Sequence, residues 1–142
     1  MVNSLSAFFA QNAKKIENKK IIVSERFVDA EGKPIPFEIT CITSTENQKI
    51  KSECTKPVPV PGKKGQYTYQ TDAQAYQTSL VTHCVVSPDL KNSELQDSYG
   101  VMSAEQLIGA MLTPAEFDDL VISVVELCGF SSDDDLIDEA KN

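Results

Sequence analysis

His83 and Cys84 form the one pair in this sequence that resembles a nucleophile beside its base. A cysteine attacks as its thiolate, and a nearby imidazole can accept the thiol proton. Successive residues on a helix point about 100° apart, so these two side chains would not face each other. Cys84 also falls on the apolar side of a predicted helix, which favours a buried structural thiol. A small cytoplasmic hydrolase using Cys84 and His83 stays open as one alternative function.

The other candidate motifs do not have the spacing that their chemistry requires. The four cysteines, at positions 41, 54, 84 and 128, contain no CxxC pair, and zinc sites are normally built from such close pairs. The aspartate run at positions 133–138 has Asp138 where a calcium loop needs Gly. The segment Gly62-Lys63-Lys64-Gly65 has no Ser or Thr after its lysines, unlike a phosphate-binding loop. We therefore predict no catalytic residue, no metal and no cofactor.

Charge is divided unequally along the 142 residues, whose net charge is −8. Residues 1–70 hold 11 Lys or Arg and 7 Asp or Glu, whereas residues 71–142 hold 2 and 14. Nucleic-acid and anionic-membrane binding depend on Lys and Arg, so the composition argues against both classes of partner. The basic first half and the acidic second half leave self-association open.

No segment approaches the roughly 20 apolar residues of a membrane span. The first 20 residues place a short apolar patch before Lys14 and Lys15, which reverses the order found in a signal peptide. We expect a cytoplasmic protein, in which the four cysteines would be reduced.

The pattern of residues predicts an α+β fold in which an N-terminal β-hairpin packs on a mainly helical body. Residues 1–19 read as an arm with a short helical turn. Residues 20–27 and 37–42 are rich in β-branched and aromatic residues, and the turn cluster at residues 29–32 separates them. The single domain is expected to cover residues 20–130.

Helix signals follow the hairpin. Thr43 and Glu46 predict a capped helix to about residue 55, and residues 57–65, with three prolines and two glycines, predict an extended mobile loop. The next helix is expected to start after residue 71 or 72 and to continue until Pro88 closes it.

The C-terminal third carries the clearest signals. Ser93 with Gln96, and Ser103 with Gln106, predict two further helix starts. Thr113, Pro114 and Glu116 predict the start of the last helix, and Gly129 its end. Residues 131–142 are expected to form an acidic, flexible tail.

The last helix is apolar over a wide arc and is the predicted place for a partner. Its main stripe should be buried, whereas Ile122 and Val125 lie off that stripe beside acidic residues. These two residues are our candidates for partner binding, and Leu107 with Met111 on the preceding helix is the second choice.

Four segments together resemble one family, the XkdN-like phage tail assembly chaperones of Gram-positive phages and prophages. The main segment is Pro88-Asp89-Leu90-Lys91-Asn92-Ser93-Glu94-Leu95-Gln96-Asp97-Ser98-Tyr99-Gly100-Val101. The others are Ser24-Glu25-Arg26-Phe27 with the hairpin up to Ile39, Glu46-Asn47, and Leu112-Thr113-Pro114-Ala115-Glu116-Phe117. The family pattern has Gly at the position of Ala115, and Ala is the better helix former there.

The resemblance implies a chaperone that binds the tape-measure protein and keeps it soluble during tail assembly, with the tail-tube protein as a further partner. It implies neither catalytic residues nor a cofactor. A structural tail or head–tail component that remains in the virion is the alternative from another class.

Overall fold

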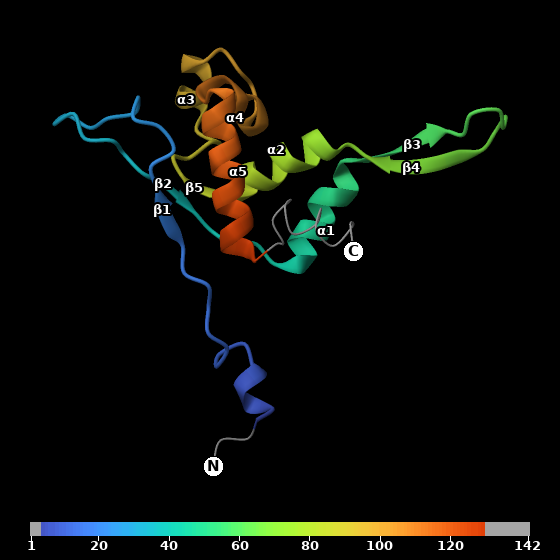
Figure 1. Cartoon of the computed structure of the whole chain (residues 1–142), viewed down its shortest axis with the longest axis horizontal. Coiled ribbons are helices and arrows are strands. Elements are labelled where there is room, and N and C mark those ends of the chain that lie inside the picture. The colour runs from blue at the N-terminus through green and yellow to red at the C-terminus, as the bar shows by residue number, and fades with distance from the viewer. Residues whose placement is uncertain (1–3, 130–142) are drawn as a thin grey trace, which may run out of the picture.

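The structure of the protein is a computed structural model that describes residues 4–129. Within these residues, five short strands form two separate antiparallel sheets, and five α-helices make up most of the body (Figure 1). The expected α+β class is therefore confirmed. The predicted acidic tail at residues 131–142 lies outside the described residues.

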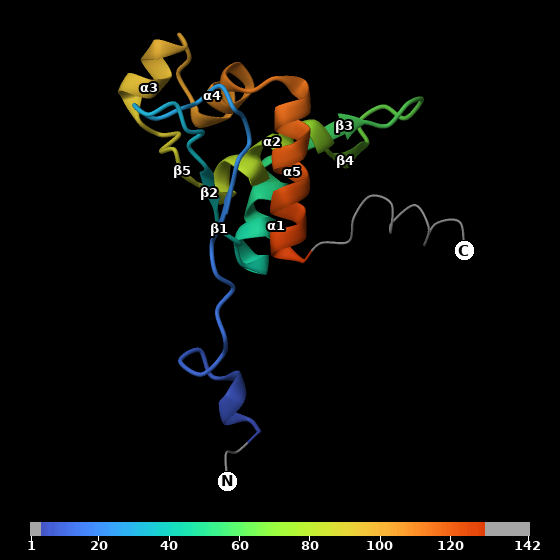
Figure 2. The same ribbon diagram turned by 60° about the vertical axis from the view of Figure 1, so that its left-hand side comes forward.

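The N-terminal segment extends away from the body in both ribbon views (Figures 1 and 2). Its described part contains the 3₁₀ turn η1, Ser6–Phe8. Phe8 is 80 % exposed and Phe9 47 % exposed, so neither ring is covered by the body. The segment leads directly into the first strand of the larger sheet.

The N-terminal hairpin is present, with shorter strands than the sequence predicted. Strand β1, Lys19–Ile21, pairs antiparallel with β2, Phe37–Ile39, so that Lys19 lies opposite Ile39. The chain between them turns at the predicted cluster, where Gly32 has a φ of +82°. Beyond Ile21 the backbone leaves the sheet, which allows residues 24–26 to reach the helical body.

The larger sheet has a third strand that the sequence analysis missed. Strand β5, Val85–Ser87, pairs with β2, and the sheet order is β1-β2-β5. The expected helix therefore ends at Cys84 rather than at Pro88. Two β-branched residues at positions 85 and 86, followed by a residue that Pro88 biases toward extended geometry, favour a strand once the free edge of β2 is adjacent.

The predicted loop at residues 57–65 is wrong only for residues 57–59, which belong to a strand, whereas residues 60–65 form the turn of a second hairpin. Strand β3, Thr55–Pro59, pairs along its whole length with β4, Tyr67–Thr71. Prolines are tolerated in β3 because both strands of a two-stranded sheet are edges. We call this hairpin, residues 55–71, the ribbon.

Four of the five α-helices begin where the capping residues predicted, and α3 begins one residue earlier. The five are α1, Ser44–Glu53; α2, Ala73–Cys84; α3, Ser93–Ser98; α4, Ala104–Met111; and α5, Pro114–Cys128. Thr43 and Thr113 each form a complete capping box with the glutamate three residues later. Asn92, rather than Ser93, caps α3. Gly129 ends α5 in the left-handed conformation, with a φ of +75°.

The core lies between the larger sheet and the helices, with α2 at its centre. Helix α2 contacts α1, α4 and α5, and it leads into β5. The side chains with the least exposure come from four elements, β2, α2, α4 and α5: Ile39, Val81, Cys84, Leu107, Ile108, Leu120 and Val124. The ribbon contributes none of them and joins the body at its base, next to α1 (Figure 1).

Candidate protein-binding surface

Arg26 joins the hairpin loop to the start of α5. Its Nη2 donates to the carbonyl oxygen of Met111 at 2.8 Å, and its Nε donates to Glu116 Oε2 at 3.3 Å. The guanidinium also lies over the ring of Phe27, 5.0 Å from the ring centre. The contact connects two of the segments that carry the family resemblance, which are far apart in the sequence.

Glu116 has two structural roles at this junction. Its carboxylate accepts from Arg26 and from the backbone N–H of Thr113, which completes the capping box of α5. Hydrogen bonds from Arg26, then from Ser24 and from the Thr113 backbone, lower the pKa of Glu116 to about 2. The same charged residue therefore stabilises the helix start and holds the hairpin loop against it.

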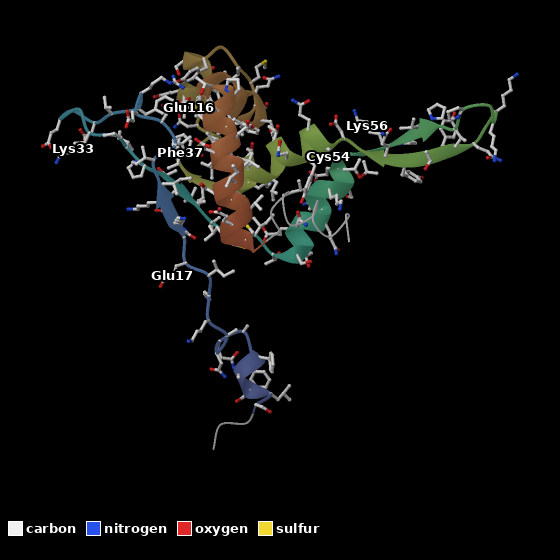
Figure 3. The ribbon with its side chains drawn as sticks, in the orientation of Figure 1. Glu17, Lys33, Phe37, Cys54, Lys56 and Glu116 are labelled. Atoms are coloured by element: carbon white, nitrogen blue, oxygen red, sulfur yellow. The ribbon has the colours of Figure 1, made fainter. Side chains whose placement is uncertain are left out.

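An apolar pocket of about 200 Å³ opens beside this junction. Three segments line it: Phe27, Ile35, Pro36 and Phe37; Ser87, Pro88, Leu95 and Tyr99; and Met111. Phe37 and Met111, at 2 % and 5 % exposed, form the floor, whereas Ile35 and Tyr99 are 47 % and 38 % exposed at the rim. Figure 3 labels Phe37 on the sheet and Glu116 on α5 on this side of the molecule.

The pocket has the chemistry of a site for apolar side chains. Its lining offers almost no hydrogen-bonding side chain beyond the hydroxyls of Ser87 and Tyr99, and Arg26 lies at its border. Grooves of this kind accept the anchor residues of an amphipathic helix. Two of the resembling segments, around Phe27 and at residues 88–101, supply much of its wall.

The four residues predicted to bind a partner occupy different environments. Ile122 is 55 % exposed and Val125 is half-buried, and neither belongs to the apolar cluster around the core. Leu107 is completely buried, so a partner cannot touch it in this conformation. Met111 is also buried but contributes to the pocket floor. Of the second-choice pair on α4, only Met111 therefore lies where a ligand in the pocket could reach it, whereas Leu107 is part of the core beside α2.

His83 and Cys84 point to different surroundings and do not act on each other. The Cys84 side chain is 0 % exposed, and burial, followed by the nearby Cys128 and Cys41 thiols, raises its pKa to about 12. His83 is exposed, and its Nδ1 lies 2.7 Å from the carbonyl oxygen of Ser79. A thiol that stays protonated and out of reach of solvent is a poor nucleophile.

The fold brings three cysteines together that are remote in the sequence. The thiols of Cys41 and Cys84 both interact with that of Cys128 at the end of α5. Burial and this contact raise the pKa of Cys41 to about 11. Over residues 4–129, no group of His, Cys, Asp and Glu has the arrangement needed to hold a metal ion. The spacing of the cysteines gave no sign of this cluster.

No local pattern in the sequence marks the pocket residues Phe27, Leu95 and Tyr99 as a site. All three lie in segments that resemble the family, and this was the one signal in the sequence that could have pointed to them.

None of the helices within residues 4–129 is both long and apolar enough to cross a membrane. Fold and surface together define a small α+β protein with an apolar site suited to a protein ligand.

The chain belongs to the family described as phage XkdN-like tail assembly chaperone proteins, which its residues 5–141 match. This is a family of assembly chaperones, not of enzymes, and the resemblance in the sequence is thereby confirmed. The chain is 28 % identical to the phage-like element PBSX protein XkdN of Bacillus subtilis (strain 168) over 143 residues, 99 % of this chain and 95 % of that protein.

Two further comparisons concern protein YqbN, also from Bacillus subtilis (strain 168). It is 28 % identical to this chain, again over 99 % of this chain and 95 % of its own length. A crystal structure of YqbN superposes with a TM-score of 0.77 at 23 % identity, covering 92 % of this chain and all of the other. At 23 % identity, this structural similarity shows a shared fold and nothing more.

Proposed function

We propose that this protein binds the tape-measure protein of a phage or prophage tail in the host cytoplasm and keeps it soluble until the tail tube assembles. The observation that carries the proposal is the family match across residues 5–141, which makes the chain a tail assembly chaperone. A tape-measure protein is long, helical and apolar, and it needs protection from aggregation before its tube is built. The tail-tube protein is a further partner under the same proposal.

The apolar pocket is the binding site that the geometry supports best. It is concave and apolar, and its exposed rim residues Ile35 and Tyr99 are available to a ligand. An amphipathic helix of the tape-measure protein would place one or two apolar anchors between Phe37 and Met111. The exposed face around Ile122 and Val125 is the second candidate surface.

Exposed isoleucines allow a matched test of the two surfaces. Ile35→Glu puts a charge on the rim of the pocket, and Ile122→Glu puts one on α5. Ile22→Glu is the control, because Ile22 is 52 % exposed in the same hairpin segment but does not line the pocket. Each variant is co-expressed with the tape-measure protein of the same tail, and the soluble fraction and a pull-down are measured.

The proposal expects Ile35→Glu to lose the tape-measure protein while Ile22→Glu retains it. Loss with Ile122→Glu alone would move the site to α5. All three folded variants should melt within a few degrees of the wild type, since exposed substitutions cost at most about 0.5 kcal/mol. A tape-measure protein that is equally soluble without this chain would contradict the function. Recovery of the chain in purified virions would instead favour a structural tail component.

A further inference from the structure

The ribbon projects from the body with little support from it (Figures 1 and 2). At its base, Thr55 Oγ1 donates to the carbonyl oxygen of Lys51 at 2.8 Å, which connects the ribbon to α1. Farther out, Tyr67 and Tyr69 are 64 % and 76 % exposed. A two-stranded hairpin without a covering layer is only marginally stable in water. The ribbon is therefore a segment that would gain from a partner.

The hydrogen bonds of the ribbon show which backbone groups face outward. Asp72 N donates to Cys54 O at 2.8 Å at one end, and Val60 N donates to Gln66 O at 3.0 Å at the other. Because hydrogen-bonded and non-hydrogen-bonded pairs alternate in an antiparallel ladder, the pairs at 56/70 and 58/68 are hydrogen-bonded. The pairs between them, Pro57 with Tyr69 and Pro59 with Tyr67, direct their backbone groups to the outside.

The two edges of the ribbon consequently differ. The outer edge of β3 presents prolines at positions 57 and 59, which have no N–H to donate. The outer edge of β4 presents complete N–H and C=O groups at Tyr67 and Tyr69, and no strand within residues 4–129 pairs with it. Natural proteins usually block both edges. In the ribbon, the prolines block the outer edge of β3, whereas the outer edge of β4 can pair with another strand.

We propose that β4 pairs antiparallel with β4 of a second copy of this chain, forming a four-stranded sheet of two ribbons. A two-fold axis at Tyr69 gives the longest overlap, since Tyr67 then lies opposite Thr71 of the second copy. Such a contact is self-complementary, as a two-fold dimer requires. The proline edges become the two outer edges of the sheet, so pairing stops at four strands.

The distribution of charge supports this occupant and this direction. Strand β4, Tyr67–Thr71, carries no charged side chain, so two copies can approach without repulsion. Antiparallel pairing places the ribbon tip, with Lys63 and Lys64, beside the base of the other ribbon. That base has mixed charge, with Glu53 and Asp72 at the end of α1 and the start of α2 beside Lys51 and Lys56. Parallel pairing would instead bring the lysines of both tips together.

Side-chain positions add to the contact. Tyr67 and Tyr69 lie on one face of β4, because residues two apart in a strand share a face. In the proposed register, Tyr69 faces Tyr69 of the second copy, and such cross-strand aromatic pairs stabilise sheets. Lys56 is on the opposite face, near the base of the ribbon and beside Cys54 (Figure 3). The pairing does not depend on the proposed function.

The test measures the mass of the full chain in solution by sedimentation equilibrium over a range of concentrations. The wild type is expected to be a dimer. Tyr69→Pro removes the outward N–H from the centre of the contact and leaves the hydrogen-bonded pairs of the ribbon in place. Since both copies lose this donor, the dissociation constant should weaken roughly tenfold or more. Tyr69→Thr is the matched control, because it keeps the N–H and the preference for β structure.

Amide hydrogen exchange of the wild type gives a second readout that does not depend on the folding of a variant. In the dimer, the amides of Tyr67 and Tyr69 should be protected, and on dilution they should become exposed while those of Thr68 and Gln70 stay protected. A wild type that is monomeric at all concentrations would overturn the proposal. So would a Tyr69→Pro variant that dimerises as well as the wild type, or Tyr67 and Tyr69 amides that exchange freely in the dimer.

Discussion

A substitution at Leu107 tests whether this residue of α4 has a structural role or a binding role. The sequence offered it as a second-choice partner residue, whereas the structure places it at 0 % exposed in the contact of α4 with α2. Truncation to alanine removes three buried carbon atoms from the side chain and leaves a cavity in the core. Leu107→Ala should therefore act on folding rather than on recognition.

The expected cost follows from complete burial. A buried leucine cut to alanine loses about 2–5 kcal/mol of unfolding free energy, the larger values applying where the surroundings cannot relax. Leu107 is part of the central cluster with Ile108, Leu120 and Val124, all 0 % exposed, so a value of about 3 kcal/mol or more is expected. For a domain of this size that corresponds to a fall in melting temperature of roughly 10 °C.

Urea unfolding followed by circular dichroism measures this loss, with Ile122→Ala as the control. Ile122 is 55 % exposed, so its truncation should change the unfolding free energy by no more than about 0.5 kcal/mol. The reasoning is refuted if Leu107→Ala unfolds within about 1 kcal/mol of the wild type, since core truncations cost more than that. Loss of partner binding by such a stable variant would restore Leu107 as a binding residue.

Three further predictions concern helix α5 and its surroundings. Thr113→Ala removes the oxygen that accepts from Glu116 N at 3.3 Å and should lower the free energy of unfolding by about 1 kcal/mol, whereas Thr113→Ser should change it little. Thermal unfolding measures both variants. An unchanged stability of Thr113→Ala would mean that the cap does not hold the helix. Because the pKa of Glu116 is lowered from 4.5 to about 2, its carboxylate favours the folded state fully above about pH 4.5, and this contribution is lost as the pH falls toward 2. Acid unfolding of the Glu116→Gln variant should lack this pH-dependent loss of stability. An acid-unfolding profile identical to that of the wild type would contradict the Arg26 contact. Cys84 is buried and has a pKa of about 12, so it should resist iodoacetamide at pH 8 in the folded protein and react after denaturation. Mass spectrometry of the labelled peptides measures this difference. Rapid labelling of Cys84 in the folded chain would place the thiol at the surface.

Local signals in the sequence identified much of the helical body. Thr43, Ser103 and Thr113 cap helices where predicted, and Gly129 ends the last one. A cap is a contact between residues three apart, so its chemistry is visible in the sequence itself. The turn around Gly32 and the pairing of the first hairpin depend on similarly short separations.

The errors lie where distant residues decide the outcome. The prolines and glycines of residues 57–65 predict a loop, yet Pro57 and Pro59 are compatible with an edge strand whose N–H positions face outward. The sequence predicts a helix through Val85, whereas pairing with the free edge of β2 places this residue in a strand. In both places the local preference was weak and a partner elsewhere in the chain determined the conformation.

The sequence by itself determined the α+β class, the helix starts and the family, because these depend on composition, short spacings and recurring motifs. Only the tertiary structure decided that Arg26 meets Glu116, that Cys41 and Cys84 meet Cys128, and that Phe37 and Met111 form the floor of a pocket. It also decided that Leu107 is buried while Ile122 is exposed. The physical reason is that an apolar residue on a helix can be buried in the core or left on the surface, and only the packing of the other elements distinguishes the two.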